Sequence, residues 1–119
     1  KKFIHVWSTG KPKREIIYVD DLANAIIYFI NKKTSHSLIN IGNSKEYSIK
    51  NIANKIVKIL DLKIKIKFDG NAKFDGTMSK VLNTTIAKKC GWKSTIKFEK
   101  AIIETYEDLV KNFKKIKGI

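Results

Sequence analysis

Apolar residues recur at helical spacing in four parts of the chain. The clearest repeat follows Ser48, which is suited to cap a helix whose apolar stripe is Ile49, Ile52, Ala53, Ile56, Val57 and Leu60. Similar spacing predicts a mostly buried helix from Leu22 to Asn31, for which Asp20 or Asp21 can serve as the cap. The two remaining predicted helices lie at Thr84–Lys89 and Phe98–Phe113.

Short apolar runs between these helices predict strands. The runs at Ile4–Trp7 and Ile16–Val19 flank the turn-forming cluster Ser8–Pro12, and a third run, Leu38–Ile41, stops at Gly42. We expect Gly42 to adopt the positive φ angle of a tight turn. A fourth predicted strand, Lys63–Phe68, alternates strictly between lysine and apolar residues, so one of its faces must be exposed to solvent. The aperiodic stretch Asp69–Lys80 is predicted to be a loop long enough to lie over a ligand.

Length and composition suggest one α/β domain. The 119 residues are 43% hydrophobic, which suits a single core. There is no apolar run long enough to span a bilayer and no secretory leader, so we expect a cytoplasmic protein. Cys90 is the only cysteine, which excludes an internal disulfide and argues against a zinc site. The chain begins with Lys1 instead of methionine, and we therefore expect a fragment of a longer protein.

The formal net charge of +14 raises nucleic acid as a partner. However, the lysines are spread from Lys1 to Lys117, and no known nucleic-acid motif accompanies them. We therefore favour a solvated basic surface, with a nucleic-acid-binding module as the less favoured alternative.

All but one of the 25 basic residues are lysine, and the exception is Arg14. A guanidinium group grips a phosphate or carboxylate at two points, which lysine cannot do. Arg14 is therefore the first candidate for a ligand contact. The alternatives are that a single arginine is present by chance or that it pairs with a neighbour such as Asp20.

Other chemical motifs are weak or absent. No glycine-rich phosphate loop follows a strand, so the chain has no dinucleotide-binding fingerprint. Tyr28 and Lys32 have the spacing of an acid/base pair, but no partner serine or cofactor loop accompanies them. No local pattern brings Cys90 together with His5 or His36.

The order of segments resembles the C-terminal part of the GDP-L-fucose synthases, which belong to the extended short-chain dehydrogenase/reductase family. The resemblance covers nearly the whole chain. Its pieces are VWSTGKPKREIIYVDDLANAI from Val6, LINIGN from Leu38, YSIKNIANKI from Tyr47, KFDGTMSKVL from Lys73 and CGWKSTIKFEKAIIETY from Cys90. The loop formed by Asp75, Gly76 and Thr77, followed by Lys80, is similar to the fucose synthase branch in particular.

This resemblance implies an α/β fragment with short strands, about four helices and the Rossmann nucleotide-binding half missing. Residues 1–119 would be a sugar-nucleotide-binding C-terminal region. Positions matching Trp7, Arg14 and Lys80 contact the GDP part of the substrate in that family. We expect Asp75 to be a further GDP-sugar-binding residue. The chemistry is reasonable because arginine and lysine suit a pyrophosphate and an indole can pack against a sugar or base.

The resemblance further implies that the parent enzyme converts GDP-4-keto-6-deoxy-D-mannose to GDP-L-fucose by epimerisation and NADPH-dependent reduction. The family's cofactor loop and catalytic residues precede this segment, so the fragment would bind no cofactor or metal and would be inactive alone. A homodimer would form through the missing part. Ser8 and Asn83 depart from the residues usual in the family, and a related sugar-nucleotide epimerase, reductase or dehydratase is therefore the alternative.

Overall fold

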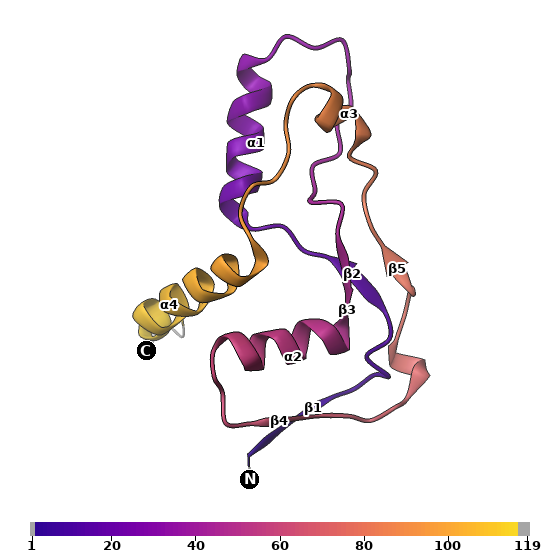
Figure 1. Ribbon diagram of the computed structural model, residues 1–119, viewed down its shortest axis with the longest axis vertical. Helices are drawn as coiled ribbons and strands as arrows, with labels where there is room; N and C mark the ends of the chain where they lie inside the picture. Colours follow the sequence, from indigo (N-terminus) through magenta and orange to yellow (C-terminus); the bar gives the residue numbers. More distant parts are fainter. Residues whose placement is uncertain (1, 117–119) are drawn as a thin grey trace.

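Two small sheets occupy one end of the computed structural model, which describes residues 2–116 (Figure 1). In the first sheet, β1 (Phe3–Val6) pairs in parallel with β4 (Lys65–Phe68). In the second sheet, β2 (Lys13–Glu15) lies between β3 (Glu46–Ser48), which is antiparallel to it, and β5 (Ser79–Lys80), which is parallel. The parallel pairs join segments far apart in the sequence, so they bring the start of the chain against its middle.

Four α-helices confirm the helical periodicity of the sequence. They are α1 (Val19–Asn31), α2 (Ile49–Ile59), α3 (Thr85–Lys89) and α4 (Phe98–Ile116). Ser48 caps α2 as predicted, since its hydroxyl oxygen accepts a hydrogen bond from the Asn51 N–H at 3.0 Å. The alternation in β4 is also confirmed, because its lysines are exposed whereas Ile66 and Phe68 are half-buried.

Two predicted strands are wrong because a strand requires a neighbour with which to pair. The polar residues Lys13–Glu15 form β2, whereas the apolar run at 16–19 leads out of it and into α1. The run at 38–41 is not a strand, and no described strand lies beside it. The side chains of Ile39 and Ile41 pack against the buried core instead. The predicted loop 69–80 contains both β5 and a short 3-10 helix, η1 (Ala72–Phe74).

The predicted aspartate cap of α1 is also wrong. Tyr18 occupies the cap position and makes no capping bond through its side chain. Asp21 is 3% exposed, and its carboxylate accepts hydrogen bonds from the N–H groups of Thr95 and Ile96 and from the Thr95 hydroxyl. It therefore ties the start of α1 to the segment that leads into α4.

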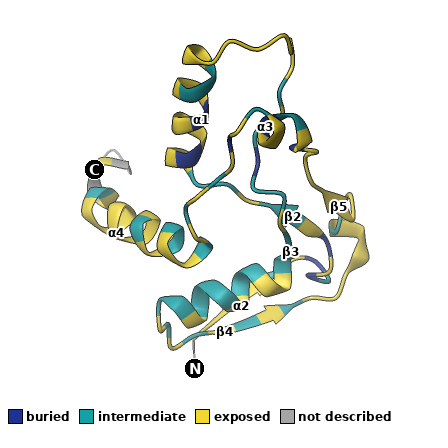
Figure 2. Ribbon diagram, turned by 45° about the horizontal axis from the view of Figure 1, so that its top comes forward, coloured by how far each residue is buried: buried dark blue, intermediate teal, exposed yellow. Residues whose placement is uncertain are grey.

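Little of the chain is fully buried. The core consists of Ala25, Ala87 and Trp92, where α1 meets α3 and the turn that follows it. Figure 2 shows α1 largely in the colour of exposed residues, so the prediction of a mostly buried helix is wrong. Ile27 and Ile30 of this helix are 59% and 77% exposed. The apolar residues of α1 do recur at helical spacing, but within residues 2–116 only one side of the helix packs against the core.

The turn after residue 41 differs from the prediction. Ser44, and not Gly42, has a positive φ, of 59°. Gly42 lies so close to Glu15 that a Cβ atom at this position would overlap with the Glu15 carboxylate. That carboxylate accepts hydrogen bonds from the N–H groups of Ser44 at 2.6 Å and Leu82 at 2.7 Å. Glu15 therefore joins β2 to two loops that are distant in sequence.

Candidate functional site

Strand pairing places two of the predicted ligand residues together. Arg14 in β2 lies directly opposite Lys80 in the parallel strand β5. Residues paired in register on adjacent strands project from the same face of a sheet, so both cations leave the same face. Lys80 is exposed and Arg14 is half-buried. The two residues are 66 positions apart, and only this non-local pairing brings them together.

The Arg14 guanidinium is held by backbone oxygens. Its Nη1 atom donates to the carbonyl oxygen of Lys13 at 2.7 Å and to that of Thr77 at 2.8 Å. A guanidinium has five N–H donors. The two hydrogen bonds use the two donors on Nη1. The Nε and Nη2 edge, with three donors, keeps its capacity for the two-point grip that suits a phosphate. The alternative that Arg14 pairs with Asp20 is not supported, since Arg14 forms no ion pair with any described residue.

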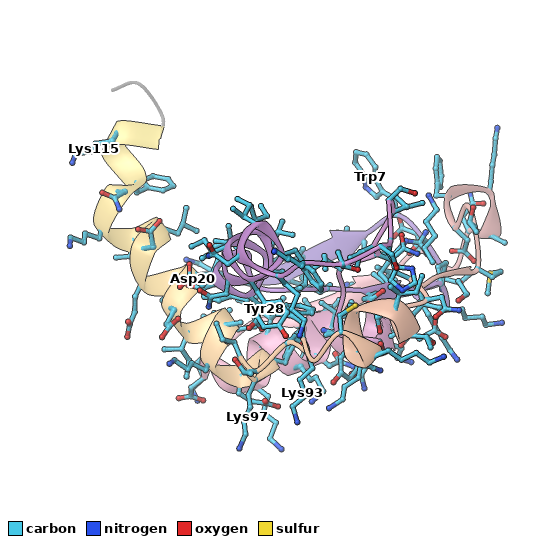
Figure 3. The ribbon with its side chains drawn as sticks, turned by 90° about the horizontal axis from the view of Figure 1, so that it is seen from above. Trp7, Asp20, Tyr28, Lys93, Lys97 and Lys115 are labelled. Atoms are coloured by element: carbon cyan, nitrogen blue, oxygen red, sulfur yellow. The ribbon has the colours of Figure 1, made fainter. Side chains whose placement is uncertain are left out.

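Trp7 lies on the loop that joins β1 to β2, seven residues before Arg14 along the chain. Trp7 is 71% exposed, and Figure 3 shows its side chain projecting away from the body of the molecule. The following residue, Ser8, is buried and accepts a hydrogen bond from the Gly10 N–H at 3.1 Å. Gly10 has a φ of 73°, and a Cβ atom there would lie 2.7 Å from the ring of Phe68. The loop is therefore tightly shaped although its tryptophan is free to meet a ligand.

Asp75 fastens this loop to the segment that carries Lys80. Its two carboxylate oxygens accept hydrogen bonds from Thr9, one from the N–H at 2.8 Å and one from the hydroxyl at 2.6 Å. A further backbone bond of 2.7 Å joins the Lys13 N–H to the Met78 carbonyl oxygen. In this conformation Asp75 acts as an anchor between loops. Sequence reasoning missed its partner, Thr9, because nothing local signals a contact across 66 residues.

The pairing of β2 with β5 and the bonds of Asp75 to Thr9 link three of the predicted residues, and Trp7 lies on the same loop as Thr9. Trp7 and Lys80 offer exposed side chains, Arg14 offers an unused donor edge, and Asp75 holds the two segments together. The combined chemistry is that of two cations on one face of the sheet, with an exposed indole on the loop that leads into β2, and it suits an anionic ligand with a ring or sugar attached.

The weaker candidate residues have structural partners. The Tyr28 hydroxyl donates to the carbonyl oxygen of Cys90 at 2.7 Å, and the Lys32 ammonium lies 5.8 Å from the centroid of the Tyr28 ring. Burial, with a hydrogen bond to Glu104, raises the pKa of Tyr18 above its ordinary value of 10.0, so this phenol stays protonated at neutral pH.

Cys90 is not paired with His5, a histidine that could act as a base for its thiol. The His5 ring lies 3.3 Å from a carboxylate oxygen of Asp69, whereas the Cys90 sulfur lies 3.9 Å from the Thr34 hydroxyl oxygen. Among residues 2–116, no group of three or more histidine, cysteine or acidic side chains could hold a metal ion. No helix in the same range is long and apolar enough to cross a membrane.

Comparison with known proteins relates part of the chain to an enzyme family. Residues 1–42 match the model described as the NAD dependent epimerase/dehydratase family. Over 107 residues the chain is 33% identical to a probable GDP-L-fucose synthase 1 from Oryza sativa subsp. japonica, covering 90% of this chain and 32% of that protein. It therefore spans about a third of the length of this relative.

Two solved structures are similar to the chain. A GDP-6-OMe-4-keto-L-xylo-heptose reductase from Campylobacter jejuni is 30% identical, with a TM-score of 0.82 over 93% of this chain and 34% of its own. A GDP-mannoheptose C4 reductase from the same species, solved with NADP bound, is 31% identical with a TM-score of 0.71, covering 89% of this chain and 32% of its own. The chain is thus a fragment similar to sugar-nucleotide epimerases and reductases.

The predicted fold class is wrong. We expected a C-terminal substrate-binding part from which the Rossmann half is missing. The family model instead matches residues 1–42, so this stretch belongs to the NAD-dependent, Rossmann part of such proteins. The chain is an α/β fragment with four α-helices that includes Rossmann-part sequence. A glycine-rich loop is the local signature of a Rossmann part, and residues 1–42 contain none, so the local sequence pattern did not indicate it.

Proposed function

We propose that the chain is part of an enzyme that epimerises and reduces a GDP-linked keto sugar, as in conversion of GDP-4-keto-6-deoxy-D-mannose to GDP-L-fucose. The observation that carries the proposal is the register of β2 and β5, which sets Arg14 beside Lys80. In this proposal the free edge of Arg14 grips the pyrophosphate, Lys80 adds a second positive charge, and Trp7 packs against the sugar or base. Asp75 shapes the site through Thr9.

The parent enzyme would use NADP(H) as its hydride donor. This is consistent with the related reductase that was solved with NADP bound. The described residues contain no glycine-rich loop between a strand and a helix, so they do not fit the diphosphate of that cofactor and none is assigned to it. We accordingly expect the chain alone to bind substrate without turning it over, because hydride transfer needs cofactor and substrate in one oriented site.

The exposed apolar side of α1 supports a role within a larger enzyme. Val19, Ile26, Ile27 and Ile30 are between 55% and 77% exposed, and they lie on one short helix. Such a concentration of apolar surface is characteristic of an interface. We propose that the remaining part of the enzyme covers it, and that the complete enzyme is a homodimer.

Calorimetric titration with GDP-mannose, with UDP-glucose for comparison, tests the proposed site. Arg14→Lys keeps the charge but removes the two-point grip, and we expect roughly 10-fold to 100-fold weaker GDP-mannose binding. Lys80→Gln should also weaken binding, whereas Lys73→Gln, which removes an exposed lysine from the same loop, should leave it unchanged. Equal binding of the two sugar nucleotides, or full affinity in Arg14→Lys, would exclude a specific GDP site at this position.

The alternative of a basic nucleic-acid-binding module predicts the opposite behaviour. A diffuse electrostatic binder would bind RNA with a steep dependence on salt and would barely respond to Arg14→Lys, because the charge is retained. The same variant therefore separates the two functions. A related sugar-nucleotide epimerase or dehydratase would still need Arg14 but would prefer a different base.

A further inference from the structure

A hollow of about 480 Å³ lies between the loop that precedes β3 and the segment that leads into α4. None of the residues in the Arg14 site lines it. Figure 3 shows Lys93 and Lys97 projecting from the side of the molecule opposite to Trp7. The hollow is therefore a place separate from the proposed sugar-nucleotide site.

Four lysines from three segments line this hollow, namely Lys45, Lys88, Lys93 and Lys97. Within residues 2–116, none of these ammonium groups has a carboxylate oxygen within 4.0 Å. Like charges gathered around one space repel one another, and the repulsion is relieved when an anion enters. The gathering comes from the tertiary structure, because three of the lysines are separated from Lys45 by more than 40 residues.

The single acidic side chain in the lining offsets little of this charge. Glu99 lies 3.5 Å from the Lys55 ammonium, so its charge is shared with a cation that does not line the hollow. Its own backbone N–H donates to the carboxylate and, with Lys55, holds the pKa of Glu99 below the ordinary value of 4.5. The rings of Tyr47 and Phe98, 5.5 Å apart, form an apolar part of the wall. An apolar wall reduces the screening of nearby charges by water.

We propose that this hollow binds a small compound carrying adjacent phosphate groups. A diphosphate presents several charges within the reach of lysines on different walls, which a single monovalent anion does not. Lysine ammonium groups are mobile point charges, so they suit clustered phosphate oxygens without demanding one orientation. This site goes beyond the proposed function and does not depend on it.

Titration with inorganic pyrophosphate tests the proposal. Since the Arg14 site is also proposed to bind a diphosphate, every protein in this test carries Arg14→Lys. One test variant adds Lys93→Gln and Lys97→Gln, and its matched control adds Lys33→Gln and Lys58→Gln, two exposed lysines outside the hollow. Both variants lose two charges, so they differ only in where the charges were. Far-ultraviolet circular dichroism verifies that both are folded.

We expect saturable binding of pyrophosphate in near-physiological salt. Affinity should fall about tenfold in the Lys93 and Lys97 variant and less than twofold in the control, because each exposed contact to a phosphate contributes modestly. Inorganic sulfate should bind more weakly than pyrophosphate. The proposal is overturned if no saturable binding occurs, or if the two variants lose affinity equally. An absence of pyrophosphate binding at the hollow would not change the GDP-mannose titration at the Arg14 site, so each experiment tests one proposal only.

Discussion

Replacing Asp21 with alanine is expected to destabilise the chain strongly. The carboxylate is 3% exposed and accepts hydrogen bonds from Thr95 N–H at 3.1 Å, Ile96 N–H at 3.0 Å and the Thr95 hydroxyl at 3.2 Å. Alanine would leave these three donors without an acceptor in a partly buried place. It would also release the segment before α4 from the first turn of α1.

The magnitude follows from the three bonds. A hydrogen bond to a charged group contributes about 1.5–3 kcal/mol, and a buried donor left unpaired costs about 1–3 kcal/mol. The three bonds share one carboxylate and water replaces part of the loss, so we expect about 3 kcal/mol in total. This corresponds to a roughly 100-fold change in the unfolding equilibrium. With a urea dependence of about 1–3 kcal/mol per molar, the midpoint should fall by about 1–3 M.

Urea unfolding followed by circular dichroism at 222 nm measures this loss. Asp20→Ala is the matched control, because Asp20 is the adjacent aspartate in the same helical turn but is exposed and forms no side-chain hydrogen bond with a described residue. It should change the midpoint little, since surface substitutions usually fall within about 0.5 kcal/mol. If the two variants lose the same stability, helix dipole effects would account for Asp21 and the proposed tether between α1 and α4 would be refuted.

Two further predictions concern Gly42 and Glu99. Gly42→Ala should cost about 1–3 kcal/mol by overpacking, because the new Cβ atom meets the Glu15 carboxylate, which Ser44 holds in place. The double variant with Glu15→Ala should show less than the sum of the two single losses in urea unfolding, and strict additivity would contradict the clash. Glu99→Gln should lower stability at pH 7, and the loss should shrink as the pH falls through the folded-state pKa of Glu99. The folded-state pKa of Glu99 is depressed, so its contribution is present above about 4.5 and is lost as the pH falls through the folded value. A difference between parent and variant in thermal midpoint that grew as the pH was lowered from 7 to 3 would contradict this sign.

The sequence by itself determined the elements whose signals are local. The helix after Ser48 was predictable because one turn of chain contains both the cap and the start of the apolar stripe. The solvent-exposed face of β4 was predictable because side chains alternate between the two faces of any strand, whichever strand lies beside it. Arg14 was identified as a ligand candidate from its guanidinium chemistry alone.

Tertiary structure decided everything that depends on a distant partner. A polar segment became β2 because two other strands lie beside it, whereas the apolar run at 38–41 has no strand beside it among the described residues. The capping role expected for Asp21 gave way to bonds with Thr95, 74 residues away. The approach of Lys80 to Arg14 and the gathering of lysines around the hollow likewise arise from non-local packing. Local periodicity carries no information about such contacts, because many chain paths share the same local pattern and differ only in which segments meet.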